Sequence, residues 1–174
     1  MRATGIVRRI DELGRVVIPK EIRRTQRIHS GDALEIFTDG KGEVVFKKYS
    51  PLAELGEPAA AYADVLARRL GCGVAVCDRE KIVAAAGAGR SELLGEPLPP
   101  ELDALLARRK LYTAPEEPLH RVALGSRWLL CAAPVLVHGD IEGGVLLPGM
   151  RRDAVPDPET IRAAATAAEF LARW

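Results

Sequence analysis

The sequence of 174 residues has no long apolar run and only three cysteines. The absence of a stretch of about 18 apolar residues argues against a membrane-spanning helix. The first residues enter patterned sequence without the apolar core of a signal peptide. Cys72, Cys77 and Cys131 form an odd set, which argues against a disulfide framework and for a reducing compartment. We therefore expect a cytoplasmic protein.

Groups that could bind a metal or perform catalysis are also scarce in the second part of the chain. Cys72 and Cys77 lack partners at zinc-ligand spacing. Cys77 and Cys131 are flanked by apolar residues, which favours core positions. Of the two histidines there, His120 and His138, the latter lies in a predicted hairpin turn and is better explained as a turn residue than as a ligand. We expect no enzyme activity, no metal and no cofactor.

The net charge of +1 hides an asymmetry between the two parts of the chain. Residues 1–50 hold eleven Lys and Arg against seven Asp and Glu, or +4, whereas the remaining 124 hold fourteen against seventeen, or −3. Residues 1–30 alone hold eight positive and three negative side chains. This asymmetry indicates a surface for nucleic acid or phosphate on the first part. The alternative is a basic face that is simply solvated.

The first 50 residues alternate apolar and polar side chains as strands do. Turn and helix signals predict strands at Gly5–Ile10 and Arg15–Ile18, a turn at Asp11–Gly14, a helix from Pro19 to about Arg27, and a hairpin of Ala33–Thr38 with Glu43–Lys48. So short a segment buries little surface alone and leaves open strand edges. We therefore expect an obligate dimer whose strands interleave into one closed barrel.

The remaining residues predict a linker at 51–57 and a second domain at 58–174. Their patterns indicate a helix ending near Gly71, strands at Gly73–Cys77 and Lys81–Ala86, a helix at about Pro100–Lys110, strands at Arg127–Val137 and Ile141–Leu147, and a last helix capped by Asp157. Helices at both ends with strands between them indicate an α+β sandwich of helices against an antiparallel sheet.

Six basic residues of the first domain are candidates for binding an anion: Arg8, Arg15, Lys20, Arg23, Arg24 and Arg27. Arg8 lies in an apolar row, so its head group must reach outward. The last four fall at i, i+3, i+4 and i+7 of the predicted helix, where like charges destabilise by roughly 0.2–0.5 kcal/mol per pair. Four like charges on one side of the helix do not stabilise it, so we expect them to bind an external anion. A solvated basic face remains the alternative for Lys20 and Arg27.

A resemblance to a known family supports these candidates. The segment TGIVRRIDELGRVVIPKEIRR, followed by GDALEIF and KKYSP, resembles the swapped-hairpin DNA-binding domain of AbrB-type transition-state regulators. The order of basic domain, short linker and GAF-like domain resembles the stage V sporulation protein T branch of these regulators. The resemblance implies that two chains form each barrel, that dimers pair into a homotetramer, and that DNA is gripped by Arg8, Arg15, Arg23 and Arg24. Lys20 and Arg27 are additions from the residue pattern.

We therefore expect a nucleoid-associated transcription regulator of sporulation or stationary-phase genes that binds double-stranded DNA. It should tolerate many sequences, because groove shape matters more than fixed base contacts. Its second, GAF-like domain should bind an unknown small molecule or set the oligomeric state. Two alternatives remain open: an antitoxin-like interaction protein, since the same small barrel occurs in antitoxins, and a cysteine-dependent enzyme such as free methionine sulfoxide reductase.

Overall fold

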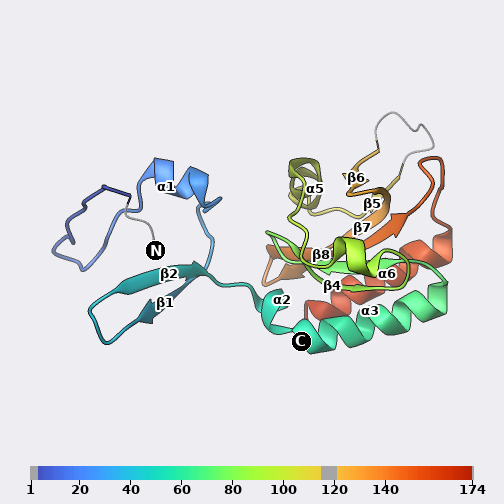
Figure 1. Cartoon of the computed structure of the whole chain (residues 1–174), viewed down its shortest axis with the longest axis horizontal. Helices are drawn as coiled ribbons and strands as arrows, with labels where there is room; N and C mark the ends of the chain where they lie inside the picture. Colours follow the sequence, from blue (N-terminus) through green and yellow to red (C-terminus); the bar gives the residue numbers. More distant parts are fainter. Residues whose placement is uncertain (1–3, 115–120, 174) are drawn as a thin grey trace. The chain divides into compact units, whose positions relative to one another are not determined.

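The computed structural model describes residues 4–114 and 121–173, and the chain divides into two compact units, Met1–Tyr49 and Ser50–Trp174 (Figure 1). Each unit has its own sheet. Within the described residues, the helices are all too short or too polar to traverse a bilayer. The α+β class expected from the sequence is confirmed.

The first unit contains one short helix and one hairpin. Its elements are α1 (Lys20–Thr25), β1 (Leu34–Thr38) and β2 (Val44–Lys48). The two strands are antiparallel and pair in register from Leu34 opposite Lys48 to Thr38 opposite Val44. Asp39 closes the connecting turn, because its Oδ1 accepts the backbone N–H groups of Lys41 at 3.1 Å and Glu43 at 2.7 Å. The predicted hairpin is therefore confirmed.

The two strands predicted at residues 5–10 and 15–18 are not formed in this single chain. The turn between them is present: the Gly14 N–H donates to the Asp11 carbonyl and the Asp11 N–H donates to the Arg15 carbonyl, both at 3.0 Å. A two-stranded ribbon alone is marginal in water, since its strands need a further strand or an apolar face to pack on. Within residues 4–49, neither β1 nor β2 provides that partner.

The second unit is a sandwich of helices around a six-stranded antiparallel sheet, with strand order β4-β3-β8-β7-β5 and β6 also paired with β7. Its helices are α2 (Pro51–Glu54), α3 (Gly56–Leu70), α4 (Arg90–Leu93), α5 (Pro100–Leu106) and α6 (Pro158–Leu171). Its strands are β3 (Val74–Cys77), β4 (Ile82–Ala86), β5 (Tyr112–Thr113), β6 (Ala123–Leu124), β7 (Arg127–Val137) and β8 (Asp140–Gly149).

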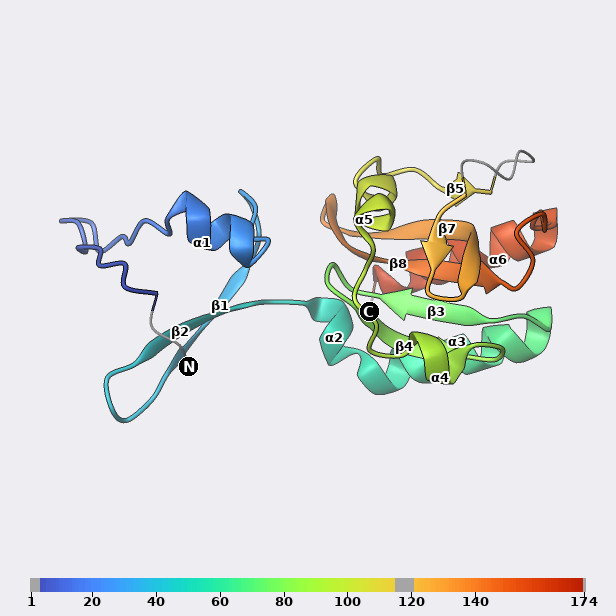
Figure 2. The same cartoon turned by 45° about the horizontal axis from the view of Figure 1, so that its top comes forward.

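Both faces of this sheet are buried, each against different helices (Figure 2). Strand alternation sends Val74 and Val76 toward α3 and α6, and sends Ala75 and Cys77 toward α4 and α5. The helix layer of α3 and α6 packs through alanines, whereas the opposite layer packs mainly through leucines. The unit therefore has two apolar layers separated by the sheet.

Local sequence signals explain where the long helices of this unit begin and end. Gly71 ends α3 with φ 63°, a conformation that glycine adopts without strain. Asp157 caps α6, because its Oδ1 accepts the N–H groups of Glu159 and Thr160, both at 2.9 Å. His138 and Gly139 have φ values of 51° and 90°, which fits a two-residue turn between β7 and β8. His138 is therefore a turn residue, as expected.

Three features of the second unit differ from the sequence-based expectation. Residues 51–57, expected to be a linker, form α2 and the start of α3, and Leu52 is 1% exposed in the core. The helix expected to reach Lys110 ends at Leu106, since Arg109 has φ 55° and cannot continue a helix. The short elements α4, β5 and β6 were not predicted, because elements of two to four residues have no detectable period.

We predict that Leu129→Ala destabilises the second unit by about 2–5 kcal/mol, because Leu129 is fully buried and its truncation leaves a cavity. Urea unfolding followed by circular dichroism measures this loss. Leu94→Ala is the matched control, since Leu94 is 50% exposed and should change stability little. Equal effects of the two substitutions would contradict the described core.

Candidate nucleic-acid interface

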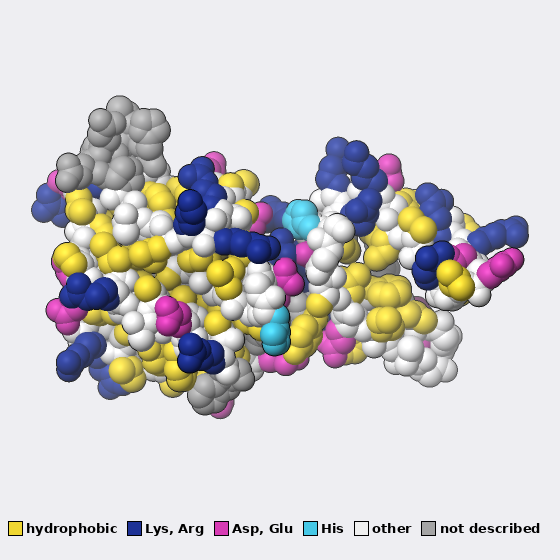
Figure 3. Space-filling model, turned by 180° about the vertical axis from the view of Figure 1, so that it is seen from behind, with side chains coloured by type: hydrophobic (Ala, Val, Ile, Leu, Met, Phe, Trp, Pro, Cys, Tyr) yellow, Lys and Arg dark blue, Asp and Glu magenta, His cyan; other side chains and the backbone are white. Residues whose placement is uncertain are grey.

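The first unit has almost no core of its own. Among residues 4–49, only Pro19 is buried. Large apolar side chains are instead exposed at Ile6, Val7, Ile10, Leu13, Val16, Val17, Ile36, Phe37, Val44 and Phe46. In Figure 3, apolar side chains of this unit lie beside a group of Lys and Arg side chains. So much exposed apolar surface on so small a unit indicates an interaction site.

Helix α1 presents three of the candidate basic residues. Pro19 precedes the helix and its carbonyl accepts the N–H of Arg23 at 2.9 Å. Lys20 and Arg24 are exposed, and Arg23 is half-buried. The Nε of Arg23 is buried and has no hydrogen-bond partner among the described residues. The structure therefore places Lys20, Arg23 and Arg24 on one short helix, as predicted.

Arg27 does not lie on the helical arc expected from the i+7 spacing. The helix ends at Thr25, and Arg27 has φ 52°, in the left-handed region. The N–H of Ile28 donates to the carbonyl of Arg23 at 2.7 Å, and the N–H of Arg27 donates to the carbonyl of Arg24 at 3.3 Å. These two bonds define a Schellman motif, in which glycine is usual at the position of Arg27. The helical placement of Arg27 was therefore wrong.

Lys48, from the end of β2, contacts this same turn. Its Nζ donates to the backbone carbonyl of Arg27 at 2.5 Å. The contact joins two parts of the unit that are 21 residues apart in the sequence. No spacing rule connects residues so far apart, so the sequence held no signal for it.

Arg8 and Arg15 lie outside α1, on the segment where strands were expected. Arg8 is exposed, and its Nη1 donates to the carbonyl of Val7 at 3.1 Å. Arg15 is fixed by Asp11, whose Oδ2 accepts its Nε at 2.8 Å. Asp11 was missed by sequence reasoning, although its i,i+4 spacing from Arg15 was an available signal.

Hydrogen bonds from Arg15 lower the pKa of Asp11 below its ordinary value. The largest cause is the backbone N–H of Arg15, followed by the guanidinium of the same residue. The N–H groups of Leu13 and Arg15 both donate to Asp11 Oδ1, at 3.0 and 2.8 Å. The carboxylate therefore stays charged at neutral pH and holds Arg15 at the turn, with 70% of the Arg15 side chain exposed.

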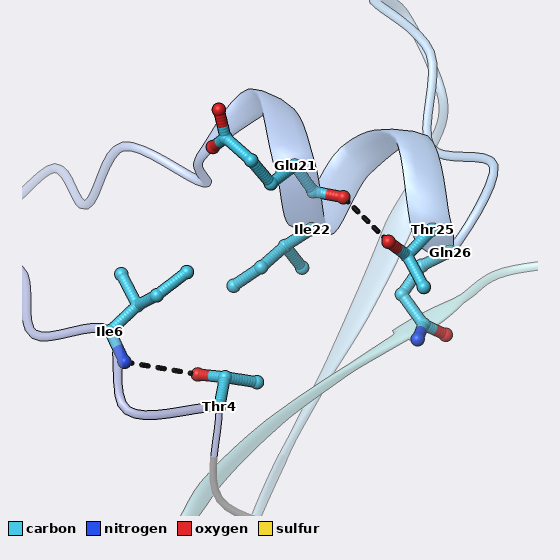
Figure 4. Close-up of a pocket in the computed structure, with 6 residues that line it drawn as sticks. All are labelled: Thr4, Ile6, Glu21, Ile22, Thr25 and Gln26. Atoms are coloured by element: carbon cyan, nitrogen blue, oxygen red, sulfur yellow. Dashed lines mark hydrogen bonds between the residues drawn. The ribbon is translucent and has the colours of Figure 1, made fainter.

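A hollow of about 210 Å³ lies between the N-terminal segment and α1 (Figure 4). Ile6 and Ile22 face each other across it. Its lining residues are Thr4, Ile6, Glu21, Ile22, Thr25 and Gln26. Two isoleucines face the hollow, and the lining contains the acidic Glu21 but none of the six candidate basic residues, so this hollow suits an apolar side chain better than an anion.

The structure brings together no metal-binding cluster within the described residues. No group of three or more His, Cys, Asp or Glu side chains in residues 4–114 and 121–173 is arranged so that it could hold a metal ion. Burial, and then the charge of Asp78, raises the pKa of the Cys77 thiol well above its ordinary value. Burial also raises the pKa of Cys131 to about 12, and that of Cys72 less strongly. His120 lies outside the described residues.

Comparisons with known proteins agree with this division into two units. Residues 54–174 match the family described as stage V sporulation protein T C-terminal, transcription factor, and residues 7–53 match that described as antidote-toxin recognition MazE, bacterial antitoxin. The chain is 41% identical to stage V sporulation protein T of Bacillus subtilis (strain 168), over 99% of this chain and 98% of that protein. It is 59% identical to the transition state regulatory protein AbrB of the same organism, over 29% of this chain and 52% of that protein.

Solved structures resemble the second unit in fold. The GAF domain of nlh2 from A. aeolicus has a TM-score of 0.50 at 15% identity, covering 73% of this chain and 85% of that one. The type II free methionine-R-sulfoxide reductase from Thermoplasma acidophilum also has a TM-score of 0.50 at 15% identity, covering 68% and 93%. The expected GAF-like fold and the expected resemblance to AbrB-type regulators are thus confirmed.

We predict that Arg27→Gly makes the first unit more stable than Arg27→Ala does, by about 1 kcal/mol. Both substitutions remove the guanidinium, but only glycine relieves the left-handed backbone at φ 52°. Thermal unfolding of the two variants in the full chain measures the difference. Equal melting temperatures would contradict the described turn.

A second prediction concerns the thiols. In the folded chain, Cys77 and Cys131 should not react with a disulfide reagent at pH 8, because both are fully buried and their pKa values are raised. All three cysteines should react once the chain is unfolded in urea. Fast reaction of either residue in the folded protein would instead favour the cysteine-dependent enzyme.

Proposed function

Because the chain belongs to the stage V sporulation protein T family, we propose that it is a transcription regulator of sporulation genes that binds double-stranded DNA through its first unit. The observation that carries this proposal is the group of basic side chains beside the exposed apolar surface of residues 4–49. An apolar surface suits a second copy of the chain, and the basic side chains suit phosphates.

Two copies form the DNA-binding barrel in this proposal. Residues 5–10 and 15–18 become strands when they pair with the same segments of a partner, which covers apolar side chains such as Val7 and Val17, 83% and 72% exposed here. The hollow between Ile6 and Ile22 receives an apolar side chain in the same assembly. Pairs of such dimers then form a homotetramer through the second unit.

Arg8, Arg15, Arg23 and Arg24 are the principal DNA contacts, and Lys20 and Arg27 add to them. One guanidinium group can donate two parallel hydrogen bonds to two oxygens of a phosphate, a geometry that the ammonium group of lysine does not offer. The exposed side chains of Arg8, Arg15 and Arg24 support these roles. Recognition tolerates many sequences, because phosphates and groove shape contribute more than individual bases.

The second unit sets the oligomeric state or responds to a small molecule, and it acts without an enzymatic step or a cofactor. Its face toward α4 and α5 is packed with buried leucines: Leu93, Leu98, Leu102, Leu106, Leu124, Leu129 and Leu146. An effector that enters this layer must therefore be largely apolar. The protein works in the cytoplasm, on the nucleoid.

An antitoxin-like role is the second candidate. The match of residues 7–53 to an antitoxin family favours it. Toxin-binding tails of antitoxins are expected to be acidic and disordered, whereas residues 50–174 form a unit with its own buried core. That core favours the regulator.

The proposal is tested by DNA affinity as a function of salt. The four principal arginines of each chain place eight in a dimer, so from these contacts alone the logarithm of affinity should fall against the logarithm of salt concentration with a slope of about −7. Replacing both Arg23 and Arg24 by Ala should lower affinity at least about tenfold and reduce the slope to about −4. Fluorescence anisotropy with a labelled duplex measures both quantities.

Arg90→Ala is the control, since Arg90 is an exposed arginine of the second unit and should leave affinity unchanged. Sedimentation of each variant checks that the assembly persists. A slope near zero for the unmodified chain, or unchanged affinity after loss of Arg23 and Arg24, would contradict the proposal.

A further inference from the structure

We infer that Lys48 is a positioning residue for DNA binding, which holds the turn that carries Arg27. This inference rests on the function proposed above. Lys48 lies at the end of β2, opposite Leu34 of β1. Its Nζ donates to the Arg27 carbonyl at 2.5 Å. The side chain thus connects the hairpin to the end of α1.

The carbonyl of Arg27 is the acceptor of this bond. It belongs to the left-handed residue that follows the C-cap, and a lysine ammonium near the end of a helix can donate to such a carbonyl. The bond to Lys48 is charge-assisted, and such bonds are stronger than neutral ones. Lys48 therefore stabilises a carbonyl that lies beyond the last turn of α1.

The backbone of Arg27 gives this bond a second consequence. A left-handed arginine is strained, and such a conformation persists only where neighbouring contacts hold it. The Schellman bonds hold the N–H side of the turn, at Arg27 and Ile28, and Lys48 holds the carbonyl of Arg27. Without Lys48, only the Schellman bonds oppose a return of Arg27 to a right-handed φ, and that return changes the direction of its side chain relative to Arg23 and Arg24.

Lys47 provides the matched control. It is the neighbouring residue on β2 and carries the same charge, but strand alternation directs it to the other face of the hairpin. Its Nζ lies 6.0 Å from the centre of the Phe37 ring. A loss caused only by removing one positive charge from the hairpin should be equal for Lys47 and Lys48.

The experiment is a double-mutant cycle on the full chain with a labelled duplex at low salt. Lys48→Gln should weaken binding by the same factor as Arg27→Ala, on the order of tenfold. The double variant should bind no more weakly than either single one, because both changes remove the same contact. Lys47→Gln should have a smaller effect, and Lys48→Arg, which keeps a charged donor, should retain most of the affinity.

Two results would overturn the inference while leaving the proposed function intact: additive losses in the double variant, which would make Lys48 an independent phosphate contact, or unchanged affinity of Lys48→Gln. Failure of the unmodified chain to bind DNA would instead overturn the proposed function, and this role with it. Lys48→Arg controls for misfolding of the glutamine variant, because it keeps a charged donor at this position. If Lys48→Arg loses as much affinity as Lys48→Gln, the positioning role is also contradicted.

Discussion

The first unit cannot cover its own apolar side chains, and both the proposed dimer and its DNA-binding surface depend on this constraint. Within residues 4–49 only Pro19 is buried, while aliphatic and aromatic residues from Ile6 to Phe46 face solvent. A unit as short as Met1–Tyr49 buries too little apolar surface alone to offset the conformational entropy that it loses on folding. In the dimer that we propose, folding and association are one process, so the stability of this unit depends there on protein concentration.

The basic residues beside this surface are held by short-range contacts that do not depend on a partner. Asp11 holds Arg15, Pro19 starts the helix of Arg23 and Arg24, and a Schellman motif ends it. Local preorganisation reduces the entropy lost when side chains meet an anion. The surface that we propose for DNA is therefore partly arranged by contacts within each chain.

The sequence predicted the second unit better than the first, for a physical reason. Strand β7 was predicted with the bounds Arg127–Val137 that the structure shows, because its apolar residues and the turn after it are local signals. The strands at 5–10 and 15–18 were predicted from an equally clear alternation but are not formed, since a strand needs a neighbour that alternation does not supply. The contact between Lys48 and Arg27 depends on tertiary structure and has no local signal.

The alanines between the sheet and its two long helices have a mechanical consequence. Ala59, Ala63 and Ala67 of α3, with Ala164, Ala167 and Ala168 of α6, form most of the helix side of this contact. Alanine has no side-chain torsion to adjust, so at these six positions the contact cannot rearrange by exchanging rotamers. A signal that crosses the layer at these alanines must therefore travel as the sliding or tilting of an entire helix.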